Sequence, residues 1–368
     1  MNQIKNYYAG SNSSQGFYSL YDEALKGLER LYILKGGPGT GKSTLIRQVG
    51  ETLAEKGWGI EFLHCSSDNG SLDGVIVPSL KAGIVDGTAP HIVDPKYPGA
   101  VDQIVNLGDC RDDSQLIPRK NEIRNLTDSI AESFSKAYSS FADAKKAHDE
   151  LEEIYLGAMD FQKADRVTEN LIAKIFPETV DPEPNSVVKT LFFGAATPNG
   201  PVDYIDNLTD GLKKRYIVKG RAGSGKSTMM KKIGRHAEDL GLNVQYFRCA
   251  FDPESLDMVI IPSLETAILD GTAPHVIEPD RPNDEVVDMF ELCIDPKVEI
   301  DQVENLREAE TPYKYLMNKG IKRLKEAKEK HDELEAYYVE AMDFEAVQGI
   351  RDKIISEILL MAHEKQPH

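Results

Sequence analysis

The chain has 368 residues, and its 61 acidic and 43 basic residues give a formal net charge of −18 at pH 7. This excess of negative charge disfavours a broad basic face, and with it sequence-independent binding to nucleic acid or to an anionic membrane. The first residues lack the pattern of a secretory signal, and no apolar run reaches the roughly 18 residues that would cross a bilayer. The four cysteines are not spaced like a zinc site, so we expect reduced thiols and a cytoplasmic location.

The sequence repeats itself over its whole length. A shift of 184 residues aligns Gly36 with Gly220, and the segment DGTAPH at 86–91 recurs at 270–275. Farther along, AMDF at 158–161 recurs at 341–344 after a gap of one residue. Because solenoid units are far shorter, a repeat of this length predicts one domain per copy, residues 1–184 and 185–368. The proline-rich, acidic segment 177–185 is the expected linker.

Each repeat is expected to begin with a core, at about 1–118 and 185–302. In the first copy, short apolar runs near 31–34, 60–63 and 82–85 predict strands, and the spacing after residue 44 predicts a helix. The second copy repeats this order near 216–218, 229–233, 244–247 and 266–269. Short strands that alternate with a helix are typical of an α/β fold with a mainly parallel sheet.

A glycine-rich loop of the pattern G-x-x-x-x-G-K-S follows the first predicted strand of each core. Strand, loop and helix in this order are the context in which the pattern holds phosphates. The glycines let backbone N–H groups turn around phosphate oxygens, the lysine reaches the β- and γ-phosphates, and the serine can bind Mg²⁺. The predicted nucleotide-binding residues are Gly36, Gly37, Pro38, Gly39, Thr40, Gly41, Lys42, Ser43 and Thr44, and Gly220, Arg221, Ala222, Gly223, Ser224, Gly225, Lys226, Ser227 and Thr228.

A carboxylate at the end of a neighbouring strand would complete the Mg²⁺ site. Asp86 and Asp270 end the last apolar run of each core, so we predict that they act beside Ser43 and Ser227 and hold the water shell of the metal. Because Asp-Gly is also a strong turn signal, a turn-capping role is the alternative.

The rival carboxylates of the metal site, Asp73 and Asp257, follow no apolar run. We predict that each lies in the first turn of a short helix, which the serine two residues earlier would cap.

Two further matched pairs are candidates for catalysis beside Lys42 and Lys226. Asp68 and Asp252 follow the second predicted strand, where a carboxylate could accept a proton from an attacking hydroxyl or water, or stabilise a loop. His91 and His275 could sense the γ-phosphate or orient water, or be hydrogen-bonded loop residues. No glutamate follows Asp86 or Asp270, so we do not expect fast autonomous hydrolysis.

The last part of each repeat changes character, at about 119–176 and 303–364. Apolar residues recur there at spacings of three and four among many charges, which predicts an amphipathic helix pair in each copy. We expect a helical-hairpin arm that packs on the protein or on a protein partner. His148 and His331 each open an HDELE segment of the arm; without a second histidine at zinc spacing, a solvated helix face is expected.

These motifs resemble those of P-loop NTPases, and more closely those of tandem-repeat P-loop ATPase-like proteins of Gram-positive bacteria. The resemblance covers nearly the whole chain and implies two tandem P-loop NTPase domains that bind ATP or GTP with Mg²⁺. No Asn/Thr-Lys-x-Asp motif, with which GTPases read the base, is present, which favours ATP.

Three classes of function follow. The first is an ATPase that is slow or stimulated by a partner, and the second is a small-molecule or nucleotide kinase with Asp68 or Asp252 as the base. The third is a scaffold that binds nucleotide without turnover. If the repeats pack as a pseudo-twofold pair, Arg221, Arg47 or Arg111 could serve the other repeat's site; the alternative is two independent sites.

Overall fold

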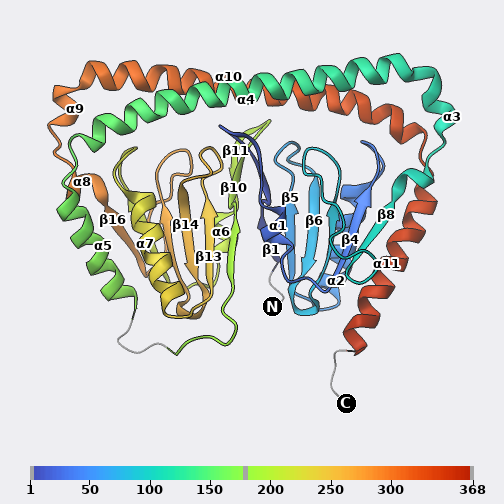
Figure 1. The fold of residues 1–368 in the computed structure, drawn as a ribbon, viewed down its shortest axis with the longest axis horizontal. Coiled ribbons are helices and arrows are strands. Elements are labelled where there is room, and N and C mark those ends of the chain that lie inside the picture. Colours follow the sequence, from blue (N-terminus) through green and yellow to red (C-terminus); the bar gives the residue numbers. More distant parts are fainter. Residues whose placement is uncertain (1–3, 177–180, 365–368) are drawn as a thin grey trace.

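The computed structural model describes residues 4–176 and 181–364. Within these ranges each repeat forms a six-stranded sheet, and the two sheets stand side by side (Figure 1). The first sheet has the strand order β1 (Ile4–Tyr7), β5 (Ile60–His64), β6 (Leu72–Val77), β7 (Ala82–Asp86), β4 (Arg30–Lys35) and β8 (Asp102–Asn106). The second has the matching order β9 (Val188–Leu191), β13 (Val244–Arg248), β14 (Leu256–Ile261), β15 (Thr266–Asp270), β12 (Lys214–Lys219) and β16 (Asp284–Asp288).

Both sheets are mixed with a parallel majority. In the first sheet β4 is parallel to β7 and β8, and β1 is parallel to β5. Strand β6 runs antiparallel to both of its neighbours, as β14 does in the second sheet. Its connections to β5 and β7, residues 65–71 and the short helix η1 (Pro78–Leu80), are too short for the crossover that parallel neighbours need. The α/β fold with two mainly parallel sheets is therefore confirmed.

The helix after each glycine-rich loop packs on its own sheet. These helices are α2 (Lys42–Glu55) and α7 (Lys226–Asp239). Leu45, Ile46, Val49 and Leu53 of α2 are buried at the spacing of one helix face, as the sequence predicts.

The prediction of a short helix that begins near Asp73 or Asp257 is wrong. Both residues lie in strands, β6 and β14. All six positions of β6 are buried because the strand is enclosed between β5 and β7. Pairing on both sides outweighs the local capping signal, and the hydroxyl of Ser71 donates instead to Asp68.

A small hairpin near the start of each repeat joins the two domains. The hairpins are β2 (Gly10–Ser13) with β3 (Gly16–Ser19), and β10 (Gly194–Thr197) with β11 (Gly200–Asp203), followed by α1 (Tyr21–Ala24) and α6 (Ile205–Leu208). Just before them, Tyr8 and Phe192 exchange two backbone hydrogen bonds of 2.9 and 3.0 Å. One apolar cluster contains Tyr7 and Leu63 together with Leu191 and Phe247, so the two domains share a core.

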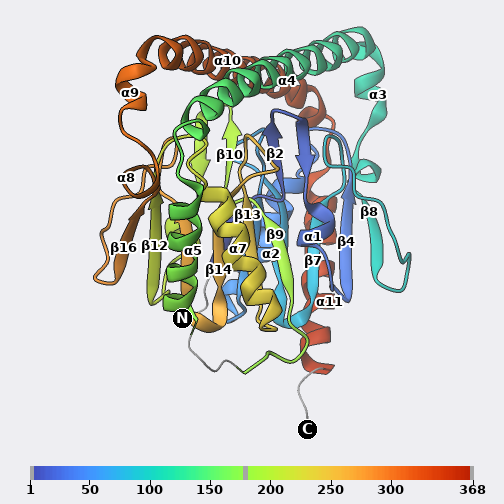
Figure 2. The same cartoon turned by 60° about the vertical axis from the view of Figure 1, so that its left-hand side comes forward.

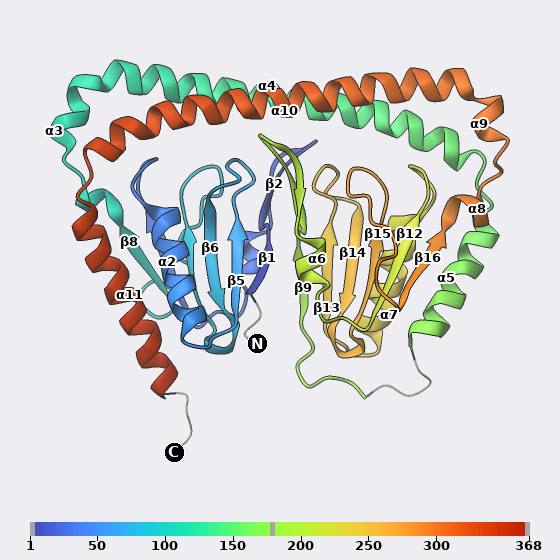
Figure 3. The ribbon, with the colours of Figure 1, turned by 180° about the vertical axis from the view of Figure 1, so that it is seen from behind.

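The arms begin with two long helices, which cross above the sheets. Helix α4 (Lys120–Leu156) runs from the first domain to the second, and α10 (Val303–Glu340) runs antiparallel to it in the other direction (Figures 1 and 3). Where they cross, the ring of Phe141 packs on Gly320, with Ala137 and Leu324 in the same cluster. Shorter helices lead into them: η2 (Leu107–Cys110), α3 (Asp113–Leu116) and η3 (Ile117–Arg119), and in the second repeat α8 (Met289–Cys293) and α9 (Val298–Asp301). The match of η1 in the second repeat is η4 (Pro262–Leu264), between β14 and β15.

The arms are exchanged between the domains. Helix α5 (Phe161–Ile175) of the first repeat lies along α7 of the second (Figure 2), where Leu171 and Ile175 join the core of that sheet. Helix α11 (Phe344–Glu364) of the second repeat likewise packs on α2, and Ile354 and Ile358 enter the first core. The predicted helices are thus present. Instead of folding back as a hairpin within one repeat, each pair spans both domains because its apolar face finds its complement on the opposite core.

Of the expected linker, residues 177–180 lie outside the described residues, and Glu183 then bonds to the backbone of Gly241 at 2.9 Å. None of the described helices combines the length and the apolar character needed to cross a membrane.

Candidate functional site

Both glycine-rich loops lie at the edge of the sheets that faces the crossed helices (Figure 1). Gly39 and Gly41 have φ values of 68° and 85°, and Gly223 and Gly225 have 71° and 83°, in the left-handed region that favours glycine. Gly41 and Gly225 begin α2 and α7, and no side chain caps either helix. Uncapped N–H groups at the start of a long helix suit an anion.

The lysine of each loop faces the aspartate predicted to serve the metal. Lys42 Nζ lies 3.7 Å from an Asp86 oxygen, and Lys226 Nζ lies 3.6 Å from Asp270. The other oxygen of Asp86 accepts bonds of 2.9 and 2.6 Å from the backbone and hydroxyl of Thr88. The carboxylate therefore caps the turn, as the alternative expected, and also faces the loop lysine; its role at a metal stays a prediction.

The loop serines lie at the same place. Ser43 Oγ accepts a hydrogen bond from the backbone of Leu72 at 2.8 Å, and Ser227 Oγ accepts the equivalent bond from Leu256 at 2.9 Å. The structure thus brings lysine, serine and aspartate together in both repeats.

Asp68 and Asp252 anchor the exchanged arms. Asp68 accepts bonds from Gly70 and Ser71 of its own loop and lies 3.4 Å from Lys328 of α10. Asp252 has the matching partner in Lys145 of α4, at 3.5 Å. Both carboxylates thus stabilise a loop, and each one is also tied to a helix of the other repeat.

The crossed helices lie directly on the glycine-rich loops. The backbone N–H of Gly39 donates to Glu335 of α10 at 3.3 Å, and the loop glycine Gly37 lies against Tyr338. In the second repeat Gly223 approaches the backbone of Glu152 of α4. Sequence reasoning missed these contacts, although the HDELE segments that supply the glutamates do recur in both arms.

The three arginines considered for service across the repeats are held mainly by polar groups of their own repeats, although Arg111 also lies over the ring of Tyr338 of the other repeat, 5.8 Å from its centroid. Arg221 pairs with Glu299 at 2.7 Å, Arg111 pairs with Asp113, and Arg47 donates to the carbonyl of Gly70. None of these contacts places an arginine at the glycine-rich loop of the other repeat. What each loop receives from the other repeat is a helix.

His91 is the centre of a buried network beneath the first loop. Its Nδ1 donates to the carbonyl of Asp86 at 3.0 Å, and its Nε2 lies 3.3 Å from Asp73, which also accepts a 2.7 Å bond from Tyr21. Burial alone lowers the pKa of His91, but the charge of Asp73 and the hydrogen bond to it outweigh burial and raise the pKa to about 9. Burial raises the pKa of Asp73, yet the charge and hydrogen bond of His91 bring it below its usual value.

This pair predicts that the protein loses stability in alkali. Because the folded pKa of His91 is raised from 6.5 to about 9, its contribution is complete below pH 6.5 and is lost as the pH rises through 9. We expect the free energy of unfolding to fall by about 3 kcal/mol over that window. In denaturant titrations, His91→Gln should flatten this slope, and so should Asp73→Asn. Parallel curves for wild type and His91→Gln would contradict the ion pair.

The second repeat arranges the same residues differently. His275 Nδ1 bonds to Asp203 at 2.7 Å, and Asp257, the match of Asp73, has no such histidine partner. Burial, followed by the charge of Asp270, raises the pKa of Asp257 to about 7. The two sites therefore share their loops but not their surroundings.

A cavity of about 590 Å³ lies beside the second loop. Its lining includes Lys226, Ser227, Asp257 and Asp270. Residues of both crossed helices also line it, among them His148, Tyr313 and Met317. His148 is 23% exposed and packs on Phe251 and Tyr313, so it forms part of a cavity wall rather than the solvated face that the sequence suggests.

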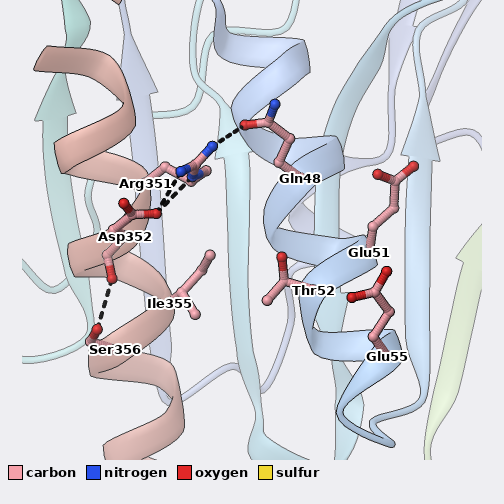
Figure 4. Close-up of a pocket in the computed structure, with 8 residues that line it drawn as sticks. All are labelled: Gln48, Glu51, Thr52, Glu55, Arg351, Asp352, Ile355 and Ser356. Atoms are coloured by element: carbon pink, nitrogen blue, oxygen red, sulfur yellow. Dashed lines mark hydrogen bonds and ion pairs between the residues drawn. The ribbon is translucent and has the colours of Figure 1, made fainter. Parts of the chain in front are cut away.

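A second hollow, of about 540 Å³, lies between α2 and α11 (Figure 4). Arg351 of α11 points across it and donates to Gln48 at 2.7 Å. Glu51, Glu55 and Asp352 make the lining mostly acidic. It is part of the seam where the exchanged arm meets the first core, away from both loops.

Comparison of the chain with protein-family models, with curated proteins and with solved structures finds no match. The functional argument therefore rests on the two sites themselves.

Proposed function

We propose that the protein binds ATP with Mg²⁺ at two sites, one in each repeat, and hydrolyses ATP slowly or when a partner stimulates it. The observation that carries the proposal is the convergence, twice in one chain, of an uncapped helix N-terminus, a loop lysine and a strand-end aspartate. The lysine-to-aspartate distances of 3.7 and 3.6 Å place a positive and a negative group side by side. A phosphate and its metal need such a pair.

The residues of each site fit both ligands. In the loops, Gly36 and Gly220 approach Thr40 and Ser224 so closely that a Cβ would lie 2.7 or 2.5 Å from their hydroxyls; the loop is thus folded tightly around its backbone N–H groups. Lys42 now donates to loop carbonyls, and a phosphate would offer it stronger acceptors. Mg²⁺ takes oxygen ligands, which Ser43 and Asp86 supply in the first site and Ser227 and Asp270 in the second.

Slow turnover is proposed for two reasons. No glutamate follows Asp86 or Asp270 to polarise water. In addition, Glu335 holds an N–H of the first loop, so a helix of the other repeat competes with phosphate for this donor. A partner that moves the crossed helices would free this N–H group. We place such a partner on the exposed outer faces of these helices.

The test is calorimetric titration of the protein with Mg·ATP. We expect two sites per chain in the wild type, one in Lys42→Ala, one in Lys226→Ala and none in the double variant. ATP at about 100 times its dissociation constant should stabilise a binding domain by about 2.7 kcal/mol. Lys26→Ala, which changes a lysine that is 67% exposed and remote from the loops, is the control. Unchanged binding in the double variant would refute the proposal.

A further inference from the structure

The two sites differ at a pair of matched carboxylates. In the first, Asp73 is 5% exposed and is held by the hydroxyl of Tyr21 at 2.7 Å and by His91 at 3.3 Å. Both partners of the carboxylate are protein groups, and the carboxylate is closed off from solvent. It has no room for contact with a bound molecule.

In the second site both partners are gone. Ile205 stands 184 residues after Tyr21 and has no hydroxyl to donate. His275 turns instead to Asp203, which replaces Ser19 at the same shift. Among the described residues, Asp257 has no ion pair and no hydrogen bond from a hydroxyl; its side-chain hydrogen bond is with the thiol of Cys249, and His275 and Lys226 act on it only through their charge. Asp257 forms part of the cavity wall.

Several residues that line the cavity are smaller than, or lack the polar group of, their matches in the first repeat. Ala196 replaces Asn12 and Pro201 replaces Phe17, each 184 residues later, while Ile321 replaces Tyr138 at the shift of 183 that applies in the arms. In the first repeat the larger groups are held by contacts, since Phe17 packs on His91 and Tyr138 donates to Asn12 at 3.0 Å.

The cavity has two kinds of lining. Lys226, Asp257 and Asp270 are charged. The rings of Phe251 and Tyr313, which also line it, meet at 65°, with their centroids 5.9 Å apart. Aromatic and aliphatic walls that face a few polar groups are typical of small-molecule sites, and about 590 Å³ is within their usual range. This lining suits a molecule that carries both an apolar ring and a hydroxyl.

We propose that the second site transfers the γ-phosphoryl group of ATP to the hydroxyl of a small ring-bearing alcohol in this cavity, with Asp257 accepting the hydroxyl proton, while the first site binds ATP without turnover. The inference rests on the proposed function and selects the kinase alternative for one site. The alcohol oxygen forms a bond to the γ-phosphorus, and the bond from that phosphorus to the bridging oxygen breaks. ADP leaves with the electron pair, and the proton passes from Asp257 to solvent. Water in place of the alcohol gives slow hydrolysis.

Asp252, the base suggested by the sequence, already has protein partners on its carboxylate. Lys145 lies 3.5 Å from it, and the hydroxyl of Ser255 donates to it at 3.2 Å. A carboxylate held by a cation and a hydroxyl is a weaker proton acceptor than one without them. Asp257 is the better placed of the two.

Paired substitutions test the assignment of the base. We expect Asp257→Asn to lower phosphate release from Mg·ATP by about 100-fold or more, with Mg·ATP affinity within about twofold of wild type. The matched Asp73→Asn should change the rate by less than about threefold. Ile205→Tyr, which places a hydroxyl beside Asp257 as Tyr21 does beside Asp73, should slow turnover; thermal unfolding checks that this variant is folded.

Turnover that depends on Asp73 and not on Asp257 overturns the inference but leaves nucleotide binding in place. Absence of Mg·ATP binding contradicts the proposed function itself.

Two alcohols test the cavity. With γ-labelled ATP, 2-phenylethanol at equal concentration should receive about tenfold more phosphoryl group than glycerol, because its ring can pack on the rings of Phe251 and Tyr313. Ala196→Phe, which fills the cavity, should abolish transfer to 2-phenylethanol while phosphate release continues. Inorganic phosphate as the sole product with both alcohols overturns the acceptor role of the cavity.

Discussion

Residues 1–184 and 185–368, produced separately, are each expected to lack a stable fold and to recover it when produced together. The first half lacks α11, and with it the buried side chains of Val347, Ile354 and Ile358. At about 1.5 to 3 kcal/mol for each buried apolar side chain, the loss reaches the 5 to 15 kcal/mol by which a whole domain is usually stable. The second half loses α5 in the same way.

Circular dichroism and sedimentation at low protein concentration measure the effect. Each half alone should unfold without a sharp transition or should self-associate, and ATP turnover should be close to zero. The halves produced together should form a 1:1 complex with the turnover of the intact chain, which also controls for the break in the chain. Monomeric halves that unfold cooperatively, with rates that add up to that of the whole protein, would show that the sites are autonomous.

Gly223→Ala is expected to lift α4 from the second loop. An added Cβ would lie 2.5 Å from the carbonyl oxygen of Glu152 and 3.1 Å from its Cα, and neither backbone atom can rotate away. Gly211→Ala is the matched control, because Gly211 has a similar φ of 76° and open space around its Cβ position. Both changes carry the left-handed cost of about 1 to 2 kcal/mol, and overpacking should add about 1 to 3 kcal/mol at Gly223 alone.

Denaturant unfolding and hydrogen exchange of residues 148–156 distinguish the two variants. Gly223→Ala should expose the amides of that segment and weaken Mg·ATP binding at the second loop. Gly211→Ala should do neither. Equal behaviour of the two variants would mean that α4 does not press on the loop.

Local sequence signals predicted the loops and their helices well, because the glycine conformations and the start of each helix depend on residues that are consecutive in the chain. The strand position of Asp73 was not predictable in this way, since it depends on pairing with β5 and β7, which are distant in the chain. The exchange of the arms was not predictable for the same reason, because it depends on contacts between segments that are distant in the chain. The spacing of Ile354 and Ile358 indicates a buried helix face but does not say which core will cover it. The difference between Tyr21 and Ile205 was visible in the sequence, but its meaning required the contact with Asp73.

The exchange of arms also bears on how such a chain could arise. A single-repeat ancestor with this arm would form a twofold dimer, in which each copy covers its partner's loop and both sites are necessarily identical. Fusion of two copies makes the pairing independent of protein concentration and allows the copies to diverge. One repeat could then keep a buried carboxylate that is bonded to protein groups, while the other acquired a cavity beside the matching carboxylate. The residues that distinguish the surroundings of Asp73 from those of Asp257 are differences of this kind, which a symmetric dimer of identical chains could not carry.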